Sequence, residues 1–188
     1  MQNKFLPLIG LFAAFAAGSF AQNVNFPTTT RVVSDLERPR VAVEKASGVK
    51  ASVIVNTARL EQIAFSIINQ KRAENGLSPL VWSDSVALIA REHSRNMAEF
   101  NFFSHKGIDN KMVSDRADDG GLLNWRSIGE NIAFNRGFDD PIEKAVENWL
   151  ESPTHKRNLL DASWQESAIG VAVAEDGSYY LTQVFLRK

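Results

Sequence analysis

The sequence contains no cysteine, which excludes both disulfide bonds and the lipidated cysteine of a lipoprotein. The fold therefore has to be held by packing alone, and a chain of 188 residues is long enough for one sizeable core. A charge excess of either sign is also missing, because 21 basic and 22 acidic residues are scattered along the chain. We therefore expect no nucleic-acid partner, since phosphate binding requires a concentrated basic patch.

Long apolar segments are missing except at the N-terminus. Lys4 precedes an apolar run over residues 5–17, and the small-residue pattern Ser-Phe-Ala follows at residues 19–21. This arrangement is typical of a secretory signal peptide, and the run is shorter than the ~20 residues of a membrane-spanning helix. We predict that residues 1–21 are a signal peptide, and that the mature protein is secreted, extracellular or periplasmic, with no transmembrane segment.

Regular apolar spacing begins only near Ala58, so residues 22–55 are predicted to be a largely irregular spacer. Beyond it, spacing and start signals predict helices and a loop with one helical turn, in the order helix 57–75, helix 84–100, loop 101–128 with a turn at 112–117, a helix from Pro141 and a short helix at 152–160. Two β-prone runs, 168–174 and 179–185, flank the turn sequence Glu-Asp-Gly-Ser. Without βαβ alternation, these elements predict an α+β layered domain.

Few residues could carry chemistry. Among the three histidines, His105 lies in Phe-Phe-Ser-His-Lys-Gly and His155 in Ser-Pro-Thr-His-Lys-Arg, while the loop between them contains Glu130 in Ile-Gly-Glu-Asn-Ile-Ala. Two imidazoles and a carboxylate form the donor set of many zinc sites. The spacing alone leaves a second interpretation open, in which Glu130 is a buried carboxylate bonded to backbone N–H groups. His93 falls on the apolar stripe of a helix and is predicted to be a core residue.

Five motifs in order, from Phe-Phe-Ser-His through Gly-Glu-Asn-Ile-Ala and Glu-Asn-Trp-Leu-Glu-Ser-Pro-Thr-His to Ile-Gly-Val-Ala-Val and Tyr-Leu-Thr-Gln-Val-Phe, make residues 56–188 resemble a known domain. They resemble the bacterial, cysteine-free branch of the CAP superfamily, whose domain is also called SCP or pathogenesis-related 1-like. The resemblance implies a three-layer α-β-α sandwich. It also implies a cleft in which two histidines and two glutamates can take a divalent metal.

Carried over residue by residue, the resemblance matches His105 and Glu130 to that cleft. Ser152 stands where the second glutamate is expected, and Tyr180 stands where the second histidine is expected. His155 resembles the histidine of a bacterial Ser-Pro-x-His-Arg pattern. The resemblance thus favours a metal-binding triad of His105, Glu130 and His155 for zinc or another divalent ion. Further candidates to line the cleft are Ser104, Asn131 and Tyr180, together with Trp125, which is a candidate because it lies in the polar loop.

Three classes of function remain open at this stage. The first is a binding module that holds a metal, a lipid, a peptide or another envelope ligand without turnover. The second is a metal-dependent hydrolase of the protease or nuclease type, in which a metal activates water. The third is a purely structural envelope protein. Serine hydrolase chemistry is disfavoured because the sequence has no Gly-x-Ser-x-Gly motif.

Overall fold

The computed structural model describes residues 55–188, so the predicted signal peptide and all of the spacer but residue 55 lie outside the described residues. The described part contains five helices and four strands, in the order α1 (Thr57–Glu74), β1 (Val81–Trp82), α2 (Asp84–Glu99), α3 (Val113–Asp119), β2 (Ser127–Asn135), α4 (Pro141–Glu151), α5 (Pro153–Leu159), β3 (Glu166–Val173) and β4 (Tyr179–Arg187). Within residues 55–188, none of the helices combines the length and the apolar character that crossing a bilayer requires.

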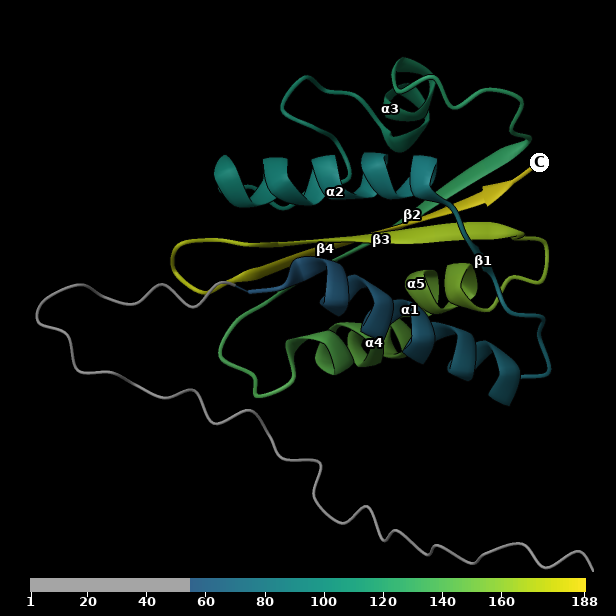
Figure 1. Cartoon of the computed structure of the whole chain (residues 1–188), viewed down its shortest axis with the longest axis horizontal. Helices are drawn as coiled ribbons and strands as arrows, with labels where there is room; N and C mark the ends of the chain where they lie inside the picture. Colours follow the sequence, from purple (N-terminus) through teal and green to yellow (C-terminus); the bar gives the residue numbers. More distant parts are fainter. Residues whose placement is uncertain (1–54) are drawn as a thin grey trace, which may run out of the picture. The chain divides into compact units, whose positions relative to one another are not determined.

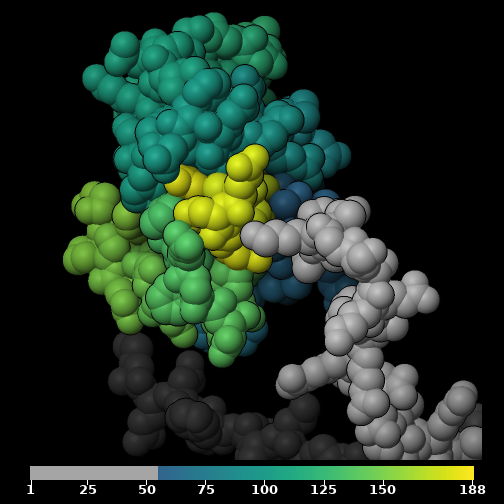
Figure 2. Space-filling model, turned by 90° about the vertical axis from the view of Figure 1, so that its left-hand side faces the viewer, coloured from purple at the N-terminus to yellow at the C-terminus, as the bar shows by residue number. Residues whose placement is uncertain are grey.

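The four strands form one mixed sheet in the order β1-β3-β4-β2. β1 pairs in parallel with β3, whereas β4 pairs antiparallel with both β3 and β2. Helices α2 and α3 cover one face of the sheet, and α1, α4 and α5 cover the other (Figure 1). Seen from the end where the β3–β4 turn lies, the two helical layers lie above and below the yellow hairpin (Figure 2). The predicted α-β-α sandwich is confirmed.

Local sequence signals account for the ends of several elements. The Asp140 side chain accepts hydrogen bonds from the backbone N–H groups of Ile142 and Glu143 at 3.1 and 2.8 Å, and Pro141 occupies the first turn of α4. Between β3 and β4, Gly177 has a φ of +83°, a conformation that a residue with a Cβ rarely adopts. The predicted helix start and the predicted hairpin both lie where these signals place them.

Each face of the sheet has its own core. Below the sheet in Figure 1, Trp149 of α4 is 1% exposed and donates from Nε1 to the carbonyl oxygen of Ile132 at 2.8 Å. On the opposite face, which α2 covers, Gly170 of β3 lies so close to this helix that an added Cβ would fall 2.3 Å from the carbonyl carbon of Ala90 and the nitrogen of Arg91. Helix α2 therefore packs directly on the backbone of β3.

Strand β1 pairs with only two residues of β3, Glu166 and Ser167. Further along β3, a glutamate side chain of α1 contacts the outer edge of the strand. Glu61 of α1 is 1% exposed, and its carboxylate accepts from the backbone N–H of Val171 at 3.3 Å. Arg91 of α2 donates to the same carboxylate from Nε and Nη2 at 2.6–3.1 Å. This buried carboxylate thus joins the two helical layers around the edge of the sheet.

Candidate functional site

A depression of about 490 Å³ lies beside β2, the edge strand opposite β1. It is lined by seven residues from three segments, the loop after α2, strand β2 and helix α5, namely Phe103, Ser104, His105, Lys106, Met112, Ile132 and His155. Two imidazoles thus share the wall of one depression with three apolar side chains. We call this depression the cleft.

His105 and Glu130, which are 25 residues apart, are in direct contact. His105 Nδ1 lies 2.8 Å from Glu130 Oε1. The Glu130 side chain is 3% exposed and that of His105 is 43% exposed, so the carboxylate lies beneath an accessible imidazole. The expectation that Glu130 lies in a loop is wrong, because Ser127–Asn135 is strand β2, in which Glu130 pairs with Val184 of β4.

Arg116 of α3 fixes both members of this pair, and the sequence analysis missed it. Its Nη2 group forms an ion pair with Glu130 Oε2. Its Nη1 group donates to the carbonyl oxygens of His105 and Lys111 at 3.0 and 2.9 Å. The one available signal was an arginine in the acidic stretch Ser-Asp-Arg-Ala-Asp-Asp, which does not identify a partner 14 residues further on.

His155 lies on α5 and lines the opposite wall of the cleft. Its ring centroid lies 6.5 Å from that of His105, with 37° between the ring planes. Burial and, to a smaller extent, the charge of His105 lower the pKa of His155, so its neutral form is favoured at neutral pH. Asn131 of β2 donates from Nδ2 to the carbonyl oxygen of His155 at 3.1 Å and so ties α5 to the edge strand.

The outer edge of β2 is occupied by side chains from the helices beside it. Asn158 of α5 donates from Nδ2 to the Asn131 side-chain oxygen at 2.9 Å and to the Glu130 carbonyl oxygen at 3.3 Å. Trp149 of α4 donates to the carbonyl oxygen of Ile132. Asn131 is 0% exposed, so its side chain connects β2 to α5 instead of contacting a ligand.

A metal bound directly by His105, Glu130 and His155 does not fit this arrangement. Both carboxylate oxygens of Glu130 are engaged, one by the imidazole and one by the guanidinium of Arg116. In the part of the chain that the structure describes, no three His, Asp or Glu side chains are grouped in a way that could hold a metal ion. The structure brings the three predicted ligands to one site without forming a ligand set.

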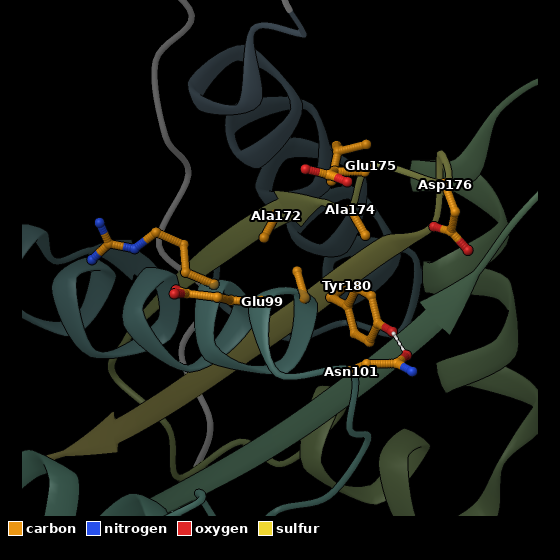
Figure 3. A pocket seen from close by; sticks show the side chains of 10 residues that line it. Glu99, Asn101, Ala172, Ala174, Glu175, Asp176 and Tyr180 are labelled. Carbon is orange, nitrogen blue, oxygen red and sulfur yellow. Dashed lines mark hydrogen bonds between the residues drawn. The ribbon is translucent and has the colours of Figure 1, made fainter.

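The remaining candidates have different surroundings. Ser104 lines the cleft, but its Oγ accepts from the Lys106 backbone N–H at 3.0 Å. Trp125 packs against the core on the α2 side, and its Nε1 donates to Asp118 Oδ1 at 3.1 Å. Tyr180 lines a separate depression of about 600 Å³ beside the β3–β4 turn, where its hydroxyl points toward Asn101 at 3.5 Å (Figure 3).

His93 supports the cleft from within the core. It is 0% exposed, and its Nε2 lies 2.9 Å from the carbonyl oxygen of Ser104, the residue before His105. Burial lowers the pKa of His93, and the charge of Glu130 opposes this shift. His93 is therefore the core histidine predicted from its helical position.

Comparison with known proteins gives matches over the described domain. The sequence matches the family model described as "CAP: Cysteine-rich secretory protein family" over residues 65–185. A Bacillus subtilis protein, "Uncharacterized membrane protein YlbC", is 31% identical over 186 residues, which are 99% of this chain and 49% of that protein. The chain spans about half the length of the curated relatives it matches.

Two solved structures share the fold. An extracellular protein from Bacillus anthracis that contains an SCP domain is 31% identical and has a TM-score of 0.60, covering 70% of this chain and 41% of that chain. An outer surface protein from Borrelia burgdorferi has a TM-score of 0.64 at 19% identity, covering 71% of this chain and 96% of that chain. The second likeness concerns the fold alone.

Proposed function

The chain belongs to the CAP family, the cysteine-rich secretory protein family, and from this membership we propose that its domain is an exported binding module. Its cleft at His105 and His155 holds a small ligand without chemical turnover. One observation carries this proposal, namely that both oxygens of Glu130 are engaged by His105 and Arg116. Neither oxygen of Glu130 is therefore free to act as the general base or the metal ligand that the hydrolase alternative requires of it.

The lining of the cleft indicates the kind of ligand. Phe103 and Met112 are 52% and 39% exposed, so a ligand that covers them removes apolar surface from water. The two imidazoles supply a polar end in the same depression. A lipid fragment or a short peptide with an apolar side chain combines both features.

The predicted divalent metal remains a separate proposal. The donors that the arrangement leaves for an ion are the ring nitrogens of His105 and His155, with Glu130 orienting His105 instead of coordinating. We rank ligand binding ahead of the metal-dependent hydrolase, because a hydrolase would need the engaged Glu130 to be released from Arg116.

Binding of an apolar fluorescent dye, anilinonaphthalene sulfonate, tests the cleft. Met112→Glu places a charge in the cleft and should weaken dye binding about tenfold, on the order of 1.4 kcal/mol. Leu123→Glu is the matched control, since Leu123 is 67% exposed and lies outside the cleft. Equal dye binding by the wild type and both variants would refute the proposed site.

Calorimetric titration with zinc chloride tests the metal, and proteolytic and nucleolytic assays test turnover. Heat of zinc binding that disappears in both His105→Ala and His155→Ala would support an ion at the two imidazoles. Zinc-dependent cleavage of a protein or a nucleic acid that is lost in His105→Ala would overturn binding without turnover.

Export is also a proposal. It is supported by the N-terminal pattern of residues 1–21 and by two structural relatives, an extracellular protein from Bacillus anthracis and an outer surface protein from Borrelia burgdorferi. N-terminal sequencing of protein recovered outside the cytoplasm should begin at Gln22. Recovery of protein that still starts at Met1 would contradict the predicted cleavage.

A further inference from the structure

We propose that Arg116 is the positioning residue of the cleft and that, through Glu130, it fixes the proton of His105 on Nδ1. The cleft then selects ligands that donate a hydrogen bond to His105 Nε2. The part concerning Arg116 stands on the geometry of the described residues, whereas the part concerning ligand selection rests on the proposed function.

Glu130 is held between the guanidinium of Arg116 and the imidazole of His105, and its side chain is 3% exposed. A guanidinium is always charged and only donates hydrogen bonds, so Glu130 Oε2 has to accept. Paired with a guanidinium in this way, Glu130 acts as a carboxylate, and its Oε1 accepts as well.

Because Glu130 Oε1 accepts, the hydrogen bond of 2.8 Å requires a proton on His105 Nδ1. A neutral imidazole carries one N–H group, so Nε2 bears a lone pair. The ring lines the cleft and its side chain is 43% exposed, so this nitrogen is the one left for a ligand.

Arg116 also holds the backbone that carries His105. The second arm of the Arg116 fork donates to the carbonyl oxygens of His105 and Lys111, the two ends of one loop segment. Lysine has no planar fork and cannot reproduce this set of contacts, although it can keep the charge next to Glu130. Arg116 therefore has two separable roles, one on the tautomer and one on the loop.

Among neutral ligands, the cleft should therefore prefer those that donate a hydrogen bond to His105 Nε2. A hydroxyl or an amide N–H can donate to a lone pair on Nε2, whereas an ether or a tertiary amide presents only acceptors. A buried acceptor that meets another acceptor lacks a hydrogen bond and costs on the order of 1–3 kcal/mol. The cleft should discriminate between ligands of the same shape on this basis.

Nitrogen-15 NMR of the histidine rings tests the tautomer without any ligand. The chain has only three histidines, and His105→Gln identifies the signals of one of them. At pH 8, His105 should show a protonated, pyrrole-like Nδ1 and a pyridine-like Nε2. A pyridine-like Nδ1 in the wild type would overturn the proposal.

Three variants separate the role on the tautomer from a general structural role. Arg116→Met should remove the tautomer preference of His105, whereas Arg116→Lys should retain it while loosening the loop of residues 105–111. Arg136→Lys is the matched control, because Arg136 forms an exposed ion pair with Asp176 outside the cleft. If Arg116→Met does not fold, Glu130→Gln tests the same step. Unchanged His105 nitrogen shifts in a folded Arg116→Met or Glu130→Gln variant would overturn the proposal.

A matched pair of neutral probes tests ligand selection. Benzyl alcohol should shift the His105 Nε2 signal at several-fold lower concentration than benzyl methyl ether, which lacks the donor. Equal or stronger binding of the ether would overturn the selection rule. Absence of binding by both probes would count against the proposed function and the selection rule, but it would leave the measured tautomer and the role of Arg116 standing.

Discussion

Replacing Arg91 by methionine should destabilise the domain more than replacing Glu61 by glutamine, although Arg91 is the more exposed partner of their ion pair. The Glu61 side chain is 2% exposed and that of Arg91 is 37% exposed. Without Arg91, the carboxylate stays buried with only the Val171 N–H as a partner. Leaving such a charge uncompensated costs about 3–5 kcal/mol.

Replacing Glu61 by glutamine removes the buried charge itself instead of its partner. In Glu61→Gln, water can reach the Arg91 guanidinium, and the amide oxygen can still accept from Val171. The loss is then limited to the charge-assisted part of the hydrogen bonds, about 1–2 kcal/mol. In the double variant no buried charge remains, so it should be more stable than Arg91→Met alone.

Urea unfolding of the two single variants and the double variant, followed by tryptophan fluorescence, measures this order. Arg136→Met serves as the control for losing a surface arginine, and it should change the free energy of unfolding by less than about 1 kcal/mol. The reasoning fails if Arg91→Met is no worse than Glu61→Gln, or if the double variant is as unstable as Arg91→Met.

Three further changes test other parts of the structure by the same unfolding assay. Trp149→Ala should cost about 3–5 kcal/mol, because the indole is 1% exposed and bonded to Ile132; a loss below ~0.5 kcal/mol would contradict its place in the core. Gly170→Ala should cost at least about 3 kcal/mol, because the new Cβ meets the backbone of α2 at 2.3 Å; a neutral result would show that α2 does not rest on β3. His93→Gln should flatten the pH dependence of stability: the folded pKa of His93 lies below its unfolded value of about 6.5, so the wild type loses stability as the pH falls from 6.5 toward the folded pKa. A parallel decline in both proteins would refute this role of His93.

Much of the fold could be predicted from local patterns. The helix predicted over residues 57–75 is α1 at Thr57–Glu74, because apolar spacing and the glycine after it are local signals. Strand β2 could not be predicted, because Gly129, Glu130 and Asn131 are poor strand formers, and pairing with β4, some 50 residues later, imposes the strand.

The candidate site, too, could be predicted only in part. His105, Glu130 and His155 could be singled out because their residue types and motifs are visible in the sequence. The contacts that decide their chemistry could not, because Arg116 reaches Glu130 only after α3 packs against β2. Trp125 was expected in the cleft because of its polar loop, but the bond to Asp118 and the apolar contacts hold it elsewhere.

The occupied outer edge of β2 limits how a peptide could be recognised. Many domains bind extended peptides by adding them as a further strand, which requires free backbone groups along a sheet edge. Here the carbonyl oxygens of Glu130 and Ile132 already accept from Asn158 and Trp149. A peptide ligand would therefore contact side chains of the cleft instead of the backbone of this strand. The same two side chains also protect the edge from pairing with a second copy of the chain at residues 130–132, which is one way in which sheet proteins avoid aggregation.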